Sequence, residues 1–221
     1  CLYLYPNTLS DAALDAINTV DTVCPYIDLP LQHADREVLA RMKRGKDADS
    51  LLRLLDRIRE RVRGAVIRSA FITGFPGETE RAFEALCDFV TKARFQSIGV
   101  FRYSPEEDSG ALGLDGAVPL ATAQRRRDAL VALQEGLSES VLAERVGQVE
   151  PVLVAGRDEG DVWWGRTACQ APEIDGVTWL GTETALEPGR LVEAEITGSG
   201  VHDLFAQPLG RARIDAGAGR D

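Results

Sequence analysis

Cysteine is scarce in this 221-residue sequence, and its four cysteines lie far apart along the chain. They are Cys1, Cys24, Cys87 and Cys169, and no Cys-x-x-Cys pair occurs among them. This spacing excludes an obvious zinc or iron–sulfur site built from neighbouring residues, and it is not typical of a disulfide scaffold. We expect Cys24, which precedes a strand, and Cys87, on the apolar face of a helix, to be packing residues.

Long apolar runs and an excess of positive charge are also missing. No stretch approaches the ~20 apolar residues of a membrane helix, and no signal-peptide pattern opens the chain, so we expect a cytoplasmic protein without a membrane partner. The formal net charge is −10. Proteins that grip a nucleic-acid backbone gather Lys and Arg, so this balance argues against a broad nucleic-acid surface. An acidic chain suits a basic partner, or simply good solubility.

Methionine occurs only once, at Met42, and the chain opens at Cys1 inside the apolar run Cys-Leu-Tyr-Leu-Tyr. A natural translation product normally begins with Met and rarely opens in the middle of a strand. We therefore expect the sequence to be a piece of a longer protein.

Residues 1–146 alternate short apolar runs with helical patterns. Strands are predicted at Leu2–Tyr5, Tyr26–Pro30, Val66–Thr73 and Ser97–Phe101. Apolar residues at 3.6-residue spacing predict helices at Ser10–Val20, Asp35–Lys43, Asp49 or Ser50 to Gly64, Thr79–Ala93 and Thr122–Val146. Four strand–helix units indicate a parallel sheet with helices outside, and they are too few to close an eight-stranded barrel. The fold class is therefore α/β, with half of a TIM-like barrel.

The sequence changes in character after Gly147. Short β-like runs separated by turns are predicted at Val149–Val154, Val162–Arg166, Val177–Leu180, Leu191–Ile196 and Val201–Phe205. Five short strands in about sixty residues are typical of a small antiparallel β-barrel of the OB-like kind, which we assign to residues 147–209. We expect the Gly-, Ala- and Arg-rich residues 210–221 to be disordered.

Three of the predicted strands end in unusual polar sequences, which a parallel sheet would bring to one rim. These are Gln32-His33 after the second strand, Gly74-Phe75-Pro76-Gly77-Glu78 after the third, and Arg102-Tyr103-Ser104-Pro105-Glu106-Glu107 after the fourth. Each also has a simple structural explanation. His33 could hydrogen-bond to a neighbouring backbone group, Glu78 could complement a helix dipole, and the two later glutamates could be solvated charge.

Three segments together carry a specific resemblance: Asp28-Leu-Pro-Leu-Gln-His-Ala34, Arg68-Ser-Ala-Phe-Ile-Thr-Gly-Phe-Pro-Gly-Glu-Thr79 and Tyr103-Ser-Pro-Glu-Glu107. The chain resembles the methylthiotransferase branch of the radical S-adenosylmethionine enzymes, which carry a C-terminal TRAM β-barrel. One subfamily modifies tRNA adenosines and the other an aspartate of the twelfth small-subunit ribosomal protein. Gln32-His33 and the run from Gly165 to Val177 resemble the second, RimO-like branch. The resemblance extends to about residue 209.

The resemblance implies a reaction in which a 4Fe–4S cluster cleaves S-adenosylmethionine and the resulting radical takes a hydrogen from the aspartate β-carbon, with a second cluster supporting transfer of the methylthio group. It also implies a rim that contacts S-adenosylmethionine, for which we select Gln32, His33, Arg68, Gly74, Gly77, Glu78, Tyr103 and Ser104. The glycines would let the backbone approach the cofactor, and the polar side chains would hydrogen-bond to it.

The chain departs from the family because the Cys-x-x-x-Cys-x-x-Cys motif and the N-terminal cysteines are missing, so it should hold neither cluster and be inactive alone. Asp108-Ser109 and Cys169-Gln170 are smaller departures. From Glu144 onward, seven Arg stand against fourteen Asp and Glu, a net of −7, which suits a basic ribosomal protein better than tRNA. The alternatives are a fragment of a tRNA-modifying enzyme and a non-catalytic TRAM module that binds ribosomal protein or RNA.

Overall fold

The computed structural model describes residues 1–106, 110–111 and 113–212, with side chains described through Gly210. The chain divides into two compact units, Cys1–Ser138 and Glu139–Asp221, and each has its own sheet. The predicted domain boundary between residues 146 and 147 stays a prediction. Among the described residues, no helix is both long enough and apolar enough to cross a membrane.

The first unit is built on a three-stranded parallel sheet of β1 (Tyr26–Asp28), β2 (Val66–Thr73) and β3 (Ser97–Arg102), with β2 in the centre. The prediction of a parallel sheet is confirmed, but the predicted strand at Leu2–Tyr5 is wrong. This segment runs beside β1, where the Leu4 N–H donates to the Asp28 carbonyl at 2.9 Å. Tyr3 has a φ of +57° and its N–H donates to the Asp28 carboxylate, which breaks the extended conformation.

Five helices follow the predicted pattern: α1 (Asp11–Thr19), α2 (Arg36–Arg41), α3 (Ala48–Arg61), α4 (Glu80–Ala93) and α5 (Leu120–Ala143). Helix α3 starts slightly earlier than predicted, because Asp47 is its N-cap. The Asp47 carboxylate accepts from the Ser50 N–H at 2.9 Å, and the Ser50 hydroxyl accepts from the Asp47 N–H at 3.1 Å. This reciprocal capping box satisfies two backbone donors that would otherwise lack a partner.

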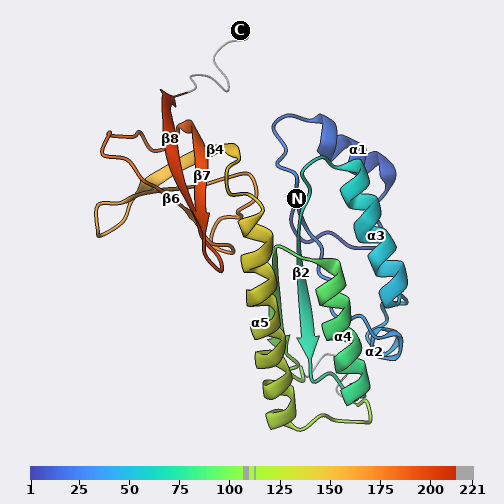
Figure 1. Ribbon diagram of the computed structural model, residues 1–221. Helices are drawn as coiled ribbons and strands as arrows, with labels where there is room; N and C mark the ends of the chain where they lie inside the picture. The colour runs from blue at the N-terminus through green and yellow to red at the C-terminus, as the bar shows by residue number, and fades with distance from the viewer. Residues whose placement is uncertain (107–109, 112, 213–221) are drawn as a thin grey trace. The chain divides into compact units, whose positions relative to one another are not determined.

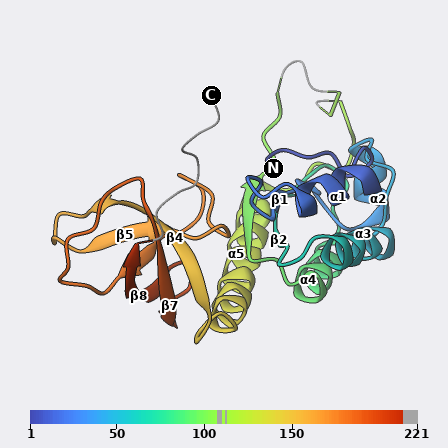
Figure 2. The same cartoon turned by 90° about the horizontal axis from the view of Figure 1, so that it is seen from above.

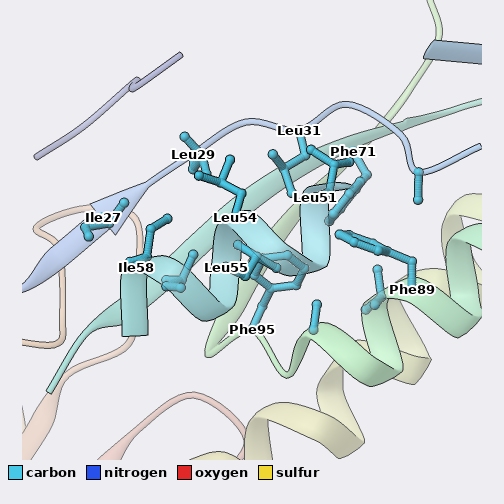
Figure 3. Close-up of a cluster of buried hydrophobic side chains, with 14 of the residues drawn as sticks. Ile27, Leu29, Leu31, Leu51, Leu54, Leu55, Ile58, Phe71, Phe89 and Phe95 are labelled. Atoms are coloured by element: carbon cyan, nitrogen blue, oxygen red, sulfur yellow. The ribbon is translucent and has the colours of Figure 1, made fainter. Parts of the chain in front are cut away.

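The core of this unit lies between the sheet and the helices on one of its faces (Figures 1 and 3). Helix α3 lies between α1 and α4, an arrangement that Figure 2 also shows. Phe71 of β2 points into this layer and meets the rings of Phe89 and Phe95 at centroid distances of 6.2 and 5.7 Å. The same cluster includes the buried apolar stripe of α3, Leu51, Leu54, Leu55 and Ile58. Residues 68, 70 and 72 alternate along β2 with the core-facing Phe71, so their side chains lie on the opposite face of the sheet.

The second unit is a closed barrel of β4 (Val149–Arg157), β5 (Trp163–Arg166), β6 (Thr178–Leu180), β7 (Leu191–Ser199) and β8 (Leu204–Ala212). The strands follow the order β4-β5-β6-β8-β7, and β7 pairs back to β4. This confirms the predicted small barrel. Its pairings are antiparallel except that between β6 and β8, which is parallel.

The last strand differs from its predicted bounds. Residues 201–203 form a turn, closed by the Gly200 N–H donating to the Asp203 carbonyl at 2.8 Å, so β8 begins at Leu204. It continues to Ala212, past the predicted barrel end at residue 209. Residues 210–212 belong to β8, so the predicted disorder of residues 210–221 is wrong for these three residues, and residues 213–221 fall outside the described part of the chain.

The barrel interior is filled by alternate residues of the strands, among them Val152, Val154, Ile196 and Leu204, all buried. Gly165 has a packing reason to be glycine, because a Cβ there would overlap the carbonyl of Leu153 on the neighbouring strand. The inward and outward faces of the barrel follow from the alternation along the strands, which is interrupted by register shifts near Gly156 and Gly198.

Candidate functional site

The rim at the ends of β1, β2 and β3 brings together most of the residues that the sequence singled out. After β1 the backbone continues to Gln32, which bridges to β2: its N–H donates to the Ala70 carbonyl, and its own carbonyl accepts from the Ile72 N–H, each at 2.8 Å. Across the next strand pair, the Tyr103 N–H donates to the Thr73 carbonyl at 2.8 Å. Gln32, the loop after Thr73 and Tyr103 therefore share one edge of the sheet.

His33 and Glu78 form a fully buried pair at this edge. The His33 Nδ1 accepts the Asp35 backbone N–H at 3.0 Å, and its Nε2 lies 3.2 Å from Glu78 Oε1. A ring nitrogen that accepts an N–H carries no proton, so the proton of the neutral imidazole sits on Nε2 and is donated to the carboxylate. The bond thus fixes both the tautomer and the ring orientation of His33.

Arg126 of α5 completes this buried cluster, although it is not among the site residues predicted from the sequence. Its Nη1 donates to Glu78 Oε2 at 2.9 Å and to the Glu78 carbonyl at 3.0 Å, while Oε2 also accepts the Gly74 N–H at 2.5 Å. Arg126 and Glu78 are each only 4% exposed, so the two opposite charges neutralise each other inside the protein. A signal existed: Arg126 stands four residues before Leu130 on the inward stripe of α5, where a charge is unusual.

The cluster also reaches the protein surface through Glu80, at the start of α4. Arg126 Nη2 donates to Glu80 Oε2 at 2.9 Å, and Arg125 Nη2 donates to the same oxygen at 3.2 Å. These hydrogen bonds, with that of Arg126 the stronger, hold the pKa of the Glu80 carboxyl below its usual value. Helix α5 is therefore fastened to the start of α4 by its two consecutive arginines.

The two glycines of the rim have structural reasons to be glycine. Gly74 has a φ of +77°, and a Cβ there would overlap the Cβ of Ala123 on α5. Gly77 has a φ of +91°, and a Cβ would stand 2.7 Å from the guanidinium Nε of Arg41. Both positions have a left-handed backbone that favours glycine. A Cβ at Gly74 would also meet fixed atoms of α5, whereas one at Gly77 would meet the flexible end of the Arg41 side chain. Their predicted contact with a cofactor stays a prediction.

Arg41 links this loop to the segment that precedes α5. Its guanidinium donates to the Asp115 carboxylate at 2.8 Å, which lowers the pKa of that carboxyl, and the Gly77 N–H donates to the Gly116 carbonyl at 2.7 Å. No local sequence pattern marks Arg41, because its partner Asp115 lies far along the chain in an irregular segment.

The other site residues predicted from the sequence do not all lie at the rim or belong to the buried cluster. Arg68 lies near the start of β2, where it donates to the Asp28 carboxylate at 2.9 Å, and so does not reach the rim. Tyr103 packs edge-on against Phe75 with centroids 5.1 Å apart, and within the described part of the chain its buried hydroxyl has no hydrogen-bond partner. Ser104 and Glu106 are exposed, whereas Glu107 and the departure at Asp108-Ser109 lie outside the described residues.

A cavity of about 320 Å³ opens beside this rim. Ile72 and Phe75 give it an apolar part, and Gln32, Arg41 and Lys43 give it polar and cationic groups; Met42, Arg44, Gly110 and Ala111 complete its lining. Small-molecule sites have this size and this mixture of apolar wall and few polar groups. The walls therefore suit a ligand with a flat apolar part and an anionic group, a chemistry that S-adenosylmethionine possesses.

Thiol groups do not offer the same fit to an iron–sulfur cluster. Cys1 and Cys24 are exposed, Cys169 is buried in the barrel, and burial raises the pKa of the Cys87 thiol to about 11. No group of three or more His, Cys, Asp or Glu side chains in the described ranges is arranged to hold a metal ion. A cluster needs several thiolates at suitable spacing, and these four cysteines do not supply them.

Comparison with known proteins connects both units to characterised families. Residues 3–90 match the Radical SAM superfamily, and residues 146–209 match the TRAM domain. Ribosomal protein uS12 methylthiotransferase RimO of Sorangium cellulosum is 44% identical over 220 residues, covering 98% of this chain and 45% of the relative. The protein of the same name from Solibacter usitatus is 43% identical over 212 residues, covering 94% and 46%. The chain thus spans about half the length of these curated relatives.

A solved structure agrees on the fold alone. Coproporphyrinogen III oxidase HemN of Escherichia coli, described as a radical SAM enzyme, superposes with a TM-score of 0.53 at 14% identity, covering 89% of this chain and 45% of that one. The parallel sheet, the five-stranded barrel, the two matched domains and the relatives agree with one another. The chain thus combines a match to the Radical SAM superfamily with a TRAM domain, and over nearly its whole length it is similar to RimO proteins.

Proposed function

We propose that this chain is the part of a uS12 methylthiotransferase that holds S-adenosylmethionine and the substrate protein, and that the full enzyme adds a methylthio group to an aspartate β-carbon. The observation that carries this proposal is the 44% identity to a RimO protein across 98% of the chain, which spans both units. The agreement of the barrel with the TRAM domain, at residues 146–209, adds support.

The lining of the cavity beside the rim suits the binding of a cofactor. Gln32, Arg41 and Lys43 line the cavity with polar groups, and Ile72 with Phe75 offers an apolar surface for a flat ring. S-adenosylmethionine would supply the radical chemistry that breaks the carbon–hydrogen bond. The buried His33–Glu78–Arg126 cluster would act indirectly, by fixing the loop after β2 that forms one wall. For His33 and Glu78 we therefore propose a positioning role rather than direct contact.

The four cysteines do not fit a 4Fe–4S cluster, so we propose that cluster ligands come from other parts of the full enzyme and that this chain is inactive alone. Anaerobic incubation with iron and sulfide tests this statement. We expect no stoichiometric visible absorbance of a 4Fe–4S centre. The coding sequence upstream of Cys1 is an independent check, since an in-frame Cys-x-x-x-Cys-x-x-Cys motif would support the proposal and a stop codon would oppose it.

For the partner we propose the basic ribosomal protein uS12 in the cytoplasm. The seven Arg and fourteen Asp and Glu from Glu144 onward give this part of the sequence a charge of −7, which would attract a basic protein and repel a phosphate backbone. Pull-down with purified uS12 and with tRNA tests the choice. Preferential binding to tRNA that falls steeply with salt would contradict it and favour the tRNA-modifying branch.

The arrangement of the cysteines also favours a second candidate, a non-catalytic module that only binds a ribosomal protein or RNA. The two candidates differ once the chain is joined to a segment that carries the cluster motif. A methylthiotransferase would then convert an aspartate of uS12 to its methylthio derivative, detected by mass spectrometry of the digested protein. A binding module would retain uS12 without changing its mass.

A further inference from the structure

The three tryptophans of the chain, Trp163, Trp164 and Trp179, all lie in the barrel, and they divide between its two faces. Trp163 pairs with Leu180, and both are buried, so this pair points inward. Trp164 pairs with Trp179 across β5 and β6, and Trp179 pairs with Phe205 across β6 and β8. Since paired residues in neighbouring strands share a face, Trp164, Trp179 and Phe205 form one outward aromatic row.

Glycine stands at both ends of the aromatic row. Gly156 of β4 is paired with Trp164, and Gly198 of β7 is paired with Phe205. The register shifts that precede each of these glycines bring them opposite the aromatic residues. Because glycine has no side chain, neither β4 at Gly156 nor β7 at Gly198 places a side chain beside the terminal rings Trp164 and Phe205.

The aromatic row is open at Trp179 and Phe205, whereas the Arg166 guanidinium lies over the ring of Trp164. Phe205 is 46% exposed, and Trp164 and Trp179 are partly exposed. A cavity of about 420 Å³ adjoins Trp179 and Phe205, and its lining also includes Asp158, Val162, Thr197 and Gln207. Single exposed apolar residues are ordinary, but an aligned row of three rings, two of which line a cavity, is typical of an interaction site.

Acidic groups accompany the row. The Asp203 carboxylate accepts the indole N–H of Trp179 at 3.0 Å, and Asp158 lines the cavity. Between residues 144 and 210, four Arg face twelve Asp and Glu, a net of −8, and no Lys is present. The barrel itself shows which ligand suits such rings, because the Arg166 guanidinium carbon lies 4.9 Å from the centroid of Trp164. Guanidinium and ammonium groups bind aromatic faces, and more strongly in a negative field.

We propose that the aromatic row docks an arginine- or lysine-rich segment of a polypeptide, with its cationic side chains against Trp179 and Phe205. This inference rests on the proposed basic protein partner and names the surface that would receive it. A single-stranded nucleic acid could also stack on such rings, but its phosphates would meet the acidic groups around them. The observations therefore favour the polypeptide.

Binding of the whole chain to fluorescently labelled uS12, to labelled deca-arginine and to labelled oligouridine tests the proposal. We expect Trp179→Ala to weaken binding of both basic probes by about tenfold, because buried aromatic anchors dominate such interfaces. Trp179→Phe keeps a ring and should stay within about threefold of the unchanged chain. Val149→Ala, at an exposed apolar position elsewhere on the barrel, is the matched control and should have no effect.

Gly198→Val separates docking from folding, since it keeps every ring. A Cβ at this position makes only ordinary contact with Phe205, at 3.7 Å, and the larger side chain would fill the space beside the row. We expect it to weaken binding while the circular dichroism of the barrel is unchanged. Unchanged affinity of Gly198→Val and Trp179→Ala would overturn the docking surface, as would tighter binding of oligouridine than of either basic probe.

Failure of the surface and failure of the proposed function give different results. If uS12 binds and the row variants bind it equally well, the surface is refuted and the partner stands. If deca-arginine binds in a Trp179-dependent way but uS12 does not, the surface stands and the partner is refuted. If neither uS12 nor deca-arginine binds, both the docking surface and the proposed partner are refuted.

Discussion

The rim of the parallel sheet and the aromatic row of the barrel use polar and apolar groups in opposite ways. At the rim, the charges of Glu78 and Arg126 are buried, and each group meets a partner of opposite charge. On the barrel, the rings of Trp179 and Phe205 are turned outward beside a cavity. Buried, paired charges hold a loop in one conformation, whereas exposed rings gain their stabilisation only when something covers them. Substitutions at the rim should therefore change folding, and substitutions in the row should change binding.

The largest expected loss in the free energy of unfolding is that of Arg126→Met. The substitution keeps most of the side-chain volume but leaves the carboxylate of Glu78 buried without its positive partner, which typically costs about 3–5 kcal/mol. Urea unfolding should show a loss of this order. Arg125→Met is the matched control, since this exposed neighbour makes the same kind of contact to Glu80 from the solvent side, and it should leave the unfolding midpoint nearly unchanged. Equal midpoints for the two variants would mean that the buried cluster does not stabilise the loop.

Sequence reasoning located the loop after β2 but not what holds it. The apolar run at Val66–Thr73, the following Gly and Pro residues and the Thr79 cap are local signals, so the strand and the start of α4 were predicted where they occur. The pairing of Arg126 with Glu78 joins residues 48 positions apart and is set by the packing of α5. No local pattern encodes such a contact. The first predicted strand was wrong for a related reason, because apolar alternation does not report the left-handed conformation of Tyr3.

A smaller loss in the free energy of unfolding is expected from Gly74→Ala. Alanine would have to adopt a φ of +77° and would also overlap Ala123 of α5, so we expect the left-handed strain and the overpacking together to cost about 2–4 kcal/mol. Gly64→Ala is the control, because Gly64 has a similar φ of +69° but no atom within 4 Å of its added Cβ. That variant should lose only the backbone contribution of about 1–2 kcal/mol. If chemical denaturation gives the same loss for both, contact with α5 does not explain the glycine at position 74.

In the barrel, the sequence predicted the first four strands, misplaced the last one, and did not predict their register. Val192, Ala194 and Ile196 alternate with acidic residues, a pattern that predicts which face of β7 turns inward, and all three side chains are buried. The aromatic row depends on which residue of β5 stands opposite which residue of β6 and β8, and on the shifts at Gly156 and Gly198. Pairings between strands are tertiary information, which composition and periodicity do not carry.

The smallest expected effect on stability is that of Phe205→Thr. This substitution tests whether the aromatic row contributes little to the folding of the barrel. Threonine suits a strand, and Phe205 is 46% exposed, so its removal should cost the barrel less than about 1 kcal/mol. Leu204 is the preceding residue of the same strand, faces inward and is fully buried, and Leu204→Ala should cost about 2–5 kcal/mol. Thermal unfolding followed by tryptophan fluorescence reports this barrel, because all three tryptophans lie in it. A loss for Phe205→Thr as large as that for Leu204→Ala would mean that the ring is part of the folding core. The row would then need no partner to explain it.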